Sequence, residues 1–120
     1  MQPALTFLKV LTMSSISCFG IAAPVSAATE CGTATYYDHS GITANGEVYN
    51  PGGLTAAHPW LPLGSWVTVI DQDTGLSVNV RINDRGPWVN GHIIDLTPVA
   101  MNAIDPHRTS DIRYVCLYEQ

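Results

Sequence analysis

The sequence predicts a small, mainly β domain, most simply a barrel, with one short helix. Several short segments alternate apolar and polar residues, and Gly, Pro, Asn and Asp turn signals separate them. One further segment has the cap and the spacing of a short helix. In an exported protein the cysteines Cys31 and Cys116 would most simply form a disulfide between the first strand and the last, and two free thiols are the alternative.

Residues 1–27 are predicted to be a signal peptide that precedes this domain. Lys9 lies before an apolar, small-residue stretch, and Val25-Ser26-Ala27 fits a cleavage site. A membrane anchor is the alternative, but serines and threonines interrupt the apolar span. Lipidation at Cys18 is not favoured, because the residues before it lack the usual pattern. Residues 28–120 are then expected to be one secreted or periplasmic domain.

The composition excludes some classes of partner. The chain has ten acidic and five basic residues, and its one lysine, Lys9, lies in the predicted signal peptide. No basic patch is available to displace counterions from phosphates, so we expect no nucleic-acid partner. We expect neither stable membrane insertion after cleavage nor an oligomer.

The first half of the domain combines one strand with a long loop. Gly32–Asp38 is rich in Thr and Tyr and is predicted to be a strand. His39–Gly53 contains several turn signals, and a loop of this length on a small domain tends to carry function. Leu54–His58 is a short apolar segment, and a proline-rich bend follows it.

The second half contains a hairpin and a final strand. Gly64–Asp71 and Leu76–Asn83 are predicted to pair as a hairpin through the turn residues between them. Trp66 lies inside the first of these strands, and we place it in the core. Ile112–Tyr118 is predicted to be the last strand.

A short helix is predicted before the last strand. Thr97 would cap it, with Pro98 at its first position and Asp105 near its end. Its buried face is expected to comprise Val99, Ala100, Ala103 and Ile104.

Two aspartates mark the stretch Val80–Leu96. An alternating strand runs into a turn that begins at Asp84, and a short apolar run after a second turn closes on Asp95. Each carboxylate therefore ends a structured segment beside a turn. The structural alternatives are an ion pair between Asp84 and Arg85, and a contribution of Asp95 to the helix cap.

Several motifs of this chain occur in the order seen in the rare lipoprotein A (RlpA) family, and the sequence resembles that family over essentially the whole domain. The resemblance implies a six-stranded double-psi β-barrel with one or two short helices, related to expansin and barwin domains. It also implies a lytic transglycosylase acting on peptidoglycan glycan strands stripped of stem peptides. The motifs are Gly32-x-Ala34-x-Tyr36-Tyr37, Thr43-Ala44-Asn45-Gly46-Glu47, Leu54-Thr55-Ala56-Ala57-His58, Leu61-Pro62-x-Gly64, Val80-x-Ile82-Asn83-Asp84-Arg85-Gly86-Pro87 and Ile94-Asp95-Leu96.

The resemblance suggests four catalytic candidates. Asp95 matches the catalytic aspartate of related enzymes, and its apolar neighbours would favour the neutral carboxyl that a general acid needs. Asp84 is its expected partner. Glu47 and His58 match further groove residues that would bond to this pair or to sugar hydroxyls. A solvated surface acid and a structural histidine are the respective alternatives for these two.

Substrate-binding candidates are Tyr36, Tyr37, Arg85 and Trp88. Aromatic rings stack on sugar faces, although core packing explains any one of them equally well. The histidines lack the spacing of metal ligands, so we expect neither a metal nor another cofactor.

The leading functional hypothesis is an exported peptidoglycan lytic transglycosylase that forms 1,6-anhydro-muramyl products. A non-catalytic expansin- or barwin-like protein that binds cell-wall polysaccharide, or acts as an inhibitor, is the main alternative. A hydrolytic endoglucanase with Asp38 as its base is a further one.

Overall fold

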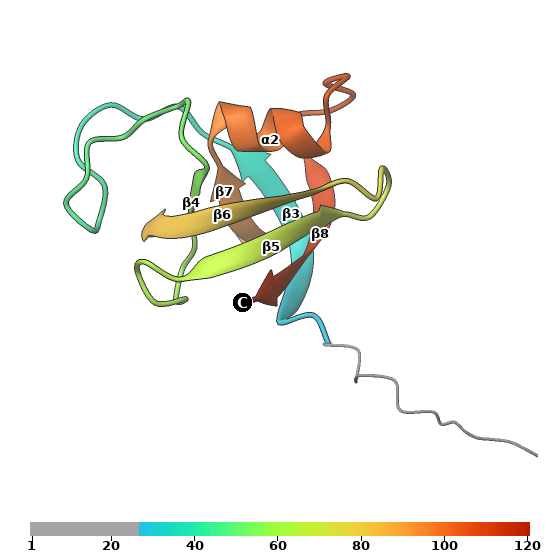
Figure 1. The fold of residues 1–120 in the computed structure, drawn as a ribbon, viewed down its shortest axis with the longest axis horizontal. Coiled ribbons are helices and arrows are strands. Elements are labelled where there is room, and N and C mark those ends of the chain that lie inside the picture. Colours follow the sequence, from blue (N-terminus) through green and yellow to red (C-terminus); the bar gives the residue numbers. More distant parts are fainter. Residues whose placement is uncertain (1–26) are drawn as a thin grey trace, which may run out of the picture.

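The computed structural model describes residues 27–120, which form a closed six-stranded barrel with one short helix (Figure 1). The predicted signal peptide lies outside the described residues except for Ala27. No helix in the described part of the chain is long and apolar enough to cross a bilayer.

Every expected strand is present, within two residues of its predicted bounds. The elements are β3 (Glu30–Tyr36), β4 (Thr55–Ala57), β5 (Trp66–Asp71), β6 (Ser77–Asp84), β7 (His92–Leu96), α2 (Pro98–Ile104) and β8 (Arg113–Glu119).

The barrel has mixed strand directions. Its strand order is β3-β7-β4-β6-β5-β8, and β8 pairs with β3 to close it. The pairs β3/β7 and β4/β6 are parallel, and the other four are antiparallel. The six-stranded double-psi barrel with a short helix is therefore confirmed.

The core forms because alternate residues of each strand point inward. In β6 the inward positions are Val78, Val80 and Ile82, which pack with apolar residues of the other strands. The helix α2 lies across one end of the barrel, against β3, β6 and β7 (Figure 1). Its buried residues close that end of the core.

The helix begins as predicted, but its buried face differs. Thr97 is the N-cap and accepts a hydrogen bond from the Ala100 amide, and a proline follows it. The buried residues are Ala100, Met101 and Ile104, whereas Val99 and Ala103 of the predicted stripe are exposed. Because Thr97 is itself fully buried, it sets the phase of the stripe, and helical spacing from it reaches Ala100, Met101 and Ile104.

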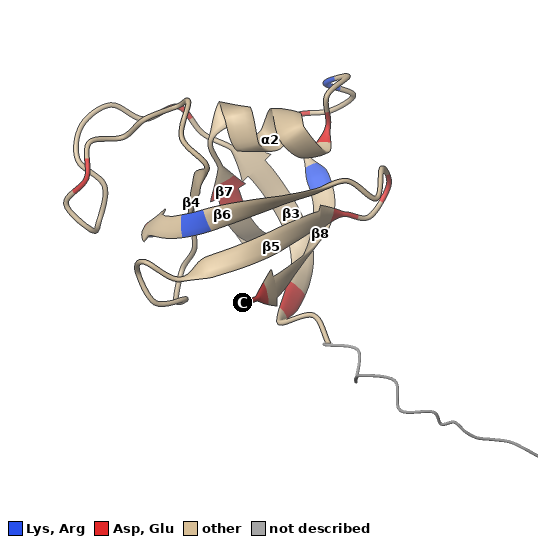
Figure 2. Cartoon of the chain, viewed as in Figure 1, with Lys and Arg blue, Asp and Glu red and all other residues tan. Residues whose placement is uncertain are grey.

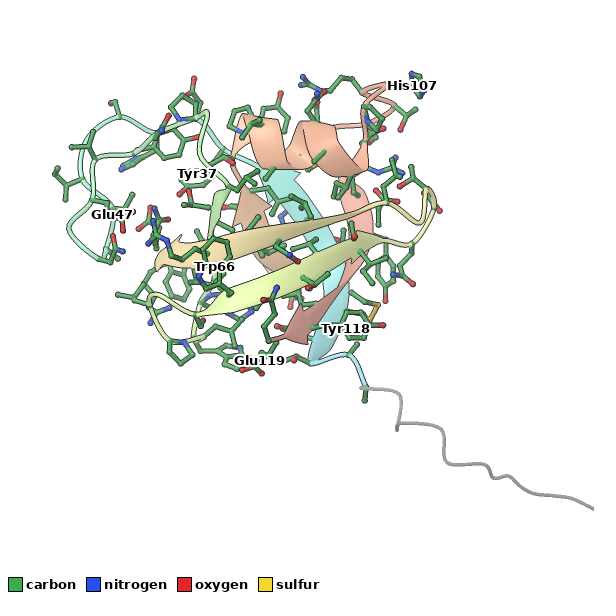
Figure 3. The ribbon with its side chains drawn as sticks, viewed as in Figure 1. Tyr37, Glu47, Trp66, His107, Tyr118 and Glu119 are labelled. Carbon is green, nitrogen blue, oxygen red and sulfur yellow. A yellow bond between two sulfur atoms is a disulfide. The ribbon has the colours of Figure 1, made fainter. Side chains whose placement is uncertain are left out.

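The prediction that Trp66 belongs to the core is wrong. Val67 and Val69 of β5 are fully buried, so the alternation of the strand places Trp66 on the outer face, where it is 46% exposed. The side chain is labelled at the start of β5 in Figure 3.

The predicted disulfide is present between Cys31 and Cys116. The two residues face each other in the register of the antiparallel pair β3/β8, with an S–S distance of 2.04 Å. The bond joins the first and last strands of the described barrel.

A buried ion pair links the start of β8 to the end of β5. The Arg113 guanidinium donates to both carboxylate oxygens of Asp71, at 2.6 and 3.0 Å, and both side chains are buried. Burial opposes ionisation of Asp71, but hydrogen bonds from Arg113 and from the Thr74 and Asp73 amides outweigh it and lower the pKa of Asp71.

Removal of the disulfide should destabilise the barrel strongly. The bond closes a loop with a sequence separation of 85 residues, so the chain-entropy model assigns it about 4–5 kcal/mol. We expect the Cys31→Ser/Cys116→Ser double variant to unfold at a markedly lower urea concentration than the oxidised protein. Addition of a reductant should leave the double variant unchanged, and equal midpoints before and after reduction of the native protein would contradict the prediction.

Loss of the buried arginine should also be costly, and the cost should depend on pH. Arg113→Met leaves the Asp71 carboxylate buried without its partner, which we expect to cost about 3–5 kcal/mol at pH 7. Because the folded-state pKa of Asp71 is lowered, the contribution of the native pair is complete above the unfolded pKa and is lost as the pH falls through the folded one.

The difference in unfolding free energy between the native protein and Arg113→Met should therefore shrink in acid, below about pH 4. Urea titrations at several pH values measure this difference. A gap that stays constant down to pH 2 would show that Asp71 is not the group involved.

Candidate functional site

The two predicted aspartates flank the same residue of β4. Ala57 pairs with Asp84 of β6 on one side and with Asp95 of β7 on the other. Neighbouring strands lie about 4.8 Å apart, so the two aspartate backbones are about 10 Å apart. The fold thus brings together two carboxylates that are separated by two turns in the sequence.

A register shift in β6 places Asp84 beside Ala57. Ala56 pairs with Ile82, but the next residue, Ala57, pairs with Asp84, so Asn83 has no partner on β4. Such irregularities re-aim side chains and are frequent beside functional sites.

Asp84 is bound by three donors. Its Oδ1 accepts from the Ala44 and Arg85 amides, both at 2.9 Å, and its Oδ2 accepts from the Tyr37 hydroxyl at 3.2 Å. These donors come from the β3–β4 loop, from the turn after β6 and from the residue after β3. They suit a carboxylate, because an ionised carboxyl accepts hydrogen bonds only.

Tyr37 is positioned by an aromatic cluster. Its ring lies 5.1 Å from that of Tyr49 and 6.2 Å from that of His39, and the Tyr49 hydroxyl donates to the Tyr37 carbonyl. Burial, the charge of Asp84 and the hydrogen bond to Asp84 raise the pKa of Tyr37, and the charge of Asp95 adds to this. Tyr37 therefore remains a protonated donor toward Asp84.

Asp95 has a simpler environment. The Thr35 hydroxyl, on the neighbouring strand β3, donates to its Oδ1. Its Oδ2 has no hydrogen-bond partner among residues 27–120. The helix cap is Thr97, so the cap alternative does not account for this carboxylate.

Glu47 bonds to its own set of partners and not to either aspartate within residues 27–120. It forms a two-pronged ion pair with Arg81, at 2.6 and 2.9 Å, and it also accepts from the Asn83 and Asn45 side chains. These hydrogen bonds, that of Arg81 first, lower the pKa of Glu47 to about 2. Glu47 is thus an ionised group on the loop, labelled in Figure 3, rather than a proton donor at neutral pH.

The loop that carries Glu47 is docked on the end of β6. Its tip is a small hairpin with a bridge between Ile42 and Val48. The Ala44 amide binds the Asp84 carboxylate, and the Asn45 amide donates to the Asn83 carbonyl at 3.2 Å. One short loop therefore contacts Asp84 and also presents Glu47 to Arg81.

His58 is fully buried and its ring is satisfied. Its Nδ1 accepts from the Trp60 and Leu61 amides, so the proton of the neutral ring is on Nε2, which donates to Glu30 at 2.8 Å. Burial lowers the pKa of His58 in spite of Glu30. The His58 amide donates to the Asp84 carbonyl, so the residue positions the backbone of Asp84.

The remaining predicted binding residues are dispersed. The Arg85 guanidinium donates to the His58 and Leu61 carbonyls, and it holds the bend after β4 rather than pairing with the Asp84 carboxylate. Tyr36 packs against the core, and Arg108 donates to its hydroxyl. Trp88 is 75% exposed.

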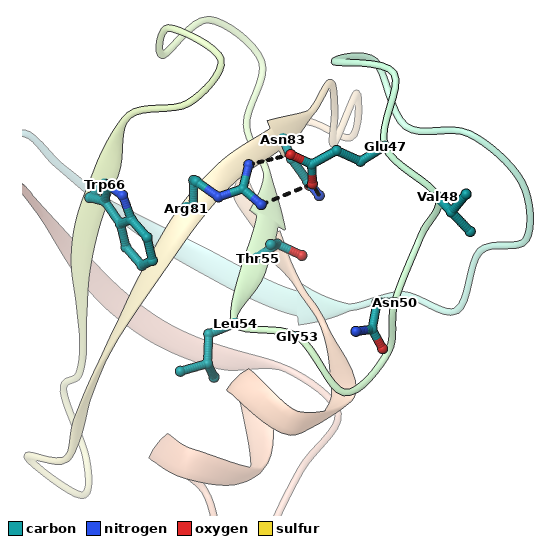
Figure 4. A pocket seen from close by; sticks show the side chains of 9 residues that line it. All are labelled: Glu47, Val48, Asn50, Gly53, Leu54, Thr55, Trp66, Arg81 and Asn83. Atoms are coloured by element: carbon teal, nitrogen blue, oxygen red, sulfur yellow. Dashed lines mark hydrogen bonds and ion pairs between the residues drawn. The ribbon is translucent and has the colours of Figure 1, made fainter.

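A pocket of about 330 Å³ lies beside Glu47, on the outer face of the barrel (Figure 4). Figure 2 colours an acidic position on the β3–β4 loop and a basic position on β6, which Glu47 and Arg81 occupy and where they form their ion pair. The lining residues are Glu47, Val48, Asn50, Gly53, Leu54, Thr55, Trp66, Arg81 and Asn83.

Thr35, Arg81 and Asn83 form hydrogen bonds with the candidate residues Asp95 and Glu47, although the sequence does not predict them as site residues. Arg81 and Asn83 occupy the polar side of the alternating pattern in β6, which is the available signal. Arg81 and Asn83 meet Glu47 only when the β3–β4 loop is in place. Thr35 meets Asp95 only when β3 pairs with β7. Among residues 27–120, no group of three His, Cys, Asp or Glu side chains is arranged to hold a metal ion.

Solved structures resemble this barrel. A Streptomyces papain inhibitor aligns with a TM-score of 0.58 and 22% identity over 77% of this chain and 96% of its own. An expansin from Clavibacter michiganensis aligns with a TM-score of 0.60 and 17% identity over 75% of this chain and 49% of its own. At these identities the likeness concerns the fold.

Sequence comparison is more specific. An endolytic peptidoglycan transglycosylase RlpA from Vibrio cholerae is 48% identical over 60% of this chain and 28% of its own length. A probable endolytic peptidoglycan transglycosylase RlpA from Synechocystis is 40% identical over 88% of this chain and 34% of its own length. The chain thus spans about a third of the length of these relatives. The family model described as lytic transglycolase matches residues 29–115, and the chain belongs to this family.

Proposed function

We propose that this chain is an exported lytic transglycosylase that cleaves naked peptidoglycan glycan strands to 1,6-anhydro-muramyl products. The observation that carries the proposal is the placement of Asp84 and Asp95 on either side of Ala57. Its family and the names of its relatives support the reaction class and the peptidoglycan substrate.

In this proposal Asp95 is the general acid. Its protonated carboxyl gives a proton to the glycosidic oxygen while the C1–O bond breaks and an oxocarbenium ion develops on the muramyl sugar. The carboxylate then takes the proton of the C6 hydroxyl of that sugar as this oxygen bonds to C1. The 1,6-anhydro ring forms without water, and the acid is restored. The unpartnered Oδ2 of Asp95 is the oxygen suited to carry this proton.

Asp84 is the ionised partner. Three hydrogen-bond donors converge on its two oxygens, so both oxygens act as acceptors, as the partner of a general acid requires. It would also stabilise the positive charge that develops on the sugar. Tyr37 positions Asp84 and is a candidate substrate contact, and the exposed Trp88 is a candidate for stacking on sugar.

Glu47 and His58 have supporting roles in this scheme. Glu47 holds Arg81 and the loop that contacts Asp84, and His58 positions the backbone of Asp84. Arg85 supports the bend that follows β4.

Export is part of the proposal. The signal-peptide pattern of residues 1–27 and the disulfide between Cys31 and Cys116 both suit an oxidising compartment outside the cytoplasm.

Asp95→Asn should abolish formation of anhydro products. The amide has a similar shape but cannot give up a proton, so we expect a loss of about 10²–10⁴-fold in rate, the usual contribution of a general acid. The measurement is digestion of amidase-treated glycan strands, with products identified by mass spectrometry. Asp111→Asn, at an exposed position of the loop before β8, is the matched control and should retain full activity.

Each alternative function predicts a different outcome of this digestion. Reducing ends without anhydro ends would indicate hydrolysis, for which two carboxyl groups about 6.5–9.5 Å apart can hold a water. Retained glycan binding without cleavage by the native protein would favour a wall-binding module. Undiminished activity in both Asp95→Asn and Asp84→Asn would refute the catalytic roles of the two aspartates.

Glu47→Gln should lower kcat/KM without moving the acid limb of the pH–rate profile. Because the pKa of Glu47 is about 2, this group is ionised at every pH at which the enzyme would work. The substitution weakens the bond to Arg81 and the docking of the loop, but it removes no group that titrates in this range. A profile of kcat/KM between pH 4 and 9 tests this, and a shifted acid limb would identify Glu47 as a titrating catalytic group.

A further inference from the structure

We infer that the pocket beside Glu47 is a subsite for the N-acetylated sugar ring of a glycan, with the Trp66 indole as its stacking surface. The inference rests on the proposed glycan substrate, but Trp66, the residue that it turns on, has no part in the proposed catalytic step.

The pocket has the size and the aromatic wall of a sugar site. Its volume of about 330 Å³ is at the lower end of the range for small-molecule sites. Trp66 lies on its wall opposite Glu47 and pairs with Arg81 across β5 and β6 (Figure 4). The residue is 46% exposed. Exposed indole at the wall of a hollow is suited to packing against the C–H face of a pyranose.

The polar wall offers hydrogen-bond donors without net charge. Glu47 occupies one N–H on each terminal nitrogen of Arg81, so three of the five guanidinium N–H groups have no partner within the described residues. Since Glu47 neutralises Arg81, a neutral acceptor such as an amide carbonyl is favoured over a carboxylate, which Glu47 would repel.

The same wall contains an unused acceptor. The Oδ1 atom of Asn83 is buried and has no hydrogen-bond partner among residues 27–120, while its Nδ2 donates to Glu47. Buried polar atoms are rarely left unpaired, and an amide N–H is a donor that would satisfy this one. The exposed side chains of Leu54 and Val48 supply apolar surface for a methyl group. An acetamido group combines a carbonyl, an N–H and a methyl.

The pocket adjoins the two aspartates along β4. Thr55, which lines the pocket, and Ala57, which lies between Asp84 and Asp95, point to the same face of that strand. Two residues of a strand span about 7 Å. A sugar in the pocket can therefore belong to the same glycan strand as the sugar at the carboxylates.

Binding of defined oligosaccharides tests the inference without any cleavage. The chain has three tryptophans, so its ¹⁵N-labelled form gives three indole signals, which single Trp→Phe variants assign. Titration with the N-acetylglucosamine tetramer should shift the Trp66 signal, and the glucose tetramer should shift it far less. Equal effects of both tetramers would overturn the acetamido assignment, and a shift confined to Trp60 or Trp88 would overturn the location.

Variants separate this subsite from the catalytic proposal. Trp66→Ala should weaken binding of the N-acetylglucosamine tetramer about tenfold, and Trp66→Phe, which keeps a ring, should weaken it less. Tyr114→Ala removes a similarly exposed aromatic residue from β8 and should bind as the native chain does. Native affinity in Trp66→Ala would refute the subsite.

Asp95→Asn should bind the tetramer normally even though it cannot cleave. If the native chain and Asp95→Asn both bind through Trp66 but neither cleaves glycan, the subsite stands and the catalytic proposal fails. If the native chain cleaves but Trp66→Ala binds and cleaves equally well, the subsite fails alone.

Discussion

The pairing of β4 with both β6 and β7 is the constraint on which the site depends. This strand has three residues, yet it pairs with a parallel neighbour on one side and an antiparallel neighbour on the other. Its last residue, Ala57, is consequently the common neighbour of Asp84 and Asp95. If β4 were displaced by one residue, Ala56 would stand between the two aspartates instead of Ala57, and Ala56 faces the core. The register of this short strand therefore determines whether the two carboxylates share a surface.

The carboxylates of this surface differ in their partners, and this difference supports distinct roles. Asp84 receives two backbone amides and a tyrosine hydroxyl, whereas Asp95 receives a single hydroxyl from Thr35. Glu47 is neutralised by Arg81 at the adjoining pocket. A pair of acids with unlike surroundings is the usual arrangement when one must donate a proton and the other must remain charged.

The loop between β3 and β4 couples the pocket to the aspartates. Its tip contributes the Ala44 amide to Asp84 and the Glu47 carboxylate to Arg81, within four residues of the chain. Movement of this loop would therefore affect the contacts of Asp84 and the wall of the pocket together. Its base is held by the Thr97 hydroxyl, which donates to the Gly53 carbonyl, so the helix that closes the barrel also fixes the loop.

The strands, the helix cap, the cysteine pair and the position of Asp84 and Asp95 at or near the ends of their strands were predictable from the amino-acid sequence, because they follow from local periodicity and turn chemistry. The face that Trp66 occupies, the buried residues of α2 and the partners of Glu47 and His58 required the folded chain. Side-chain direction in a strand depends on the phase set by its neighbours, and the partner of a charged group depends on contacts between distant segments. Arg81 and Glu47, separated by 34 residues, meet only because the loop folds back over β6.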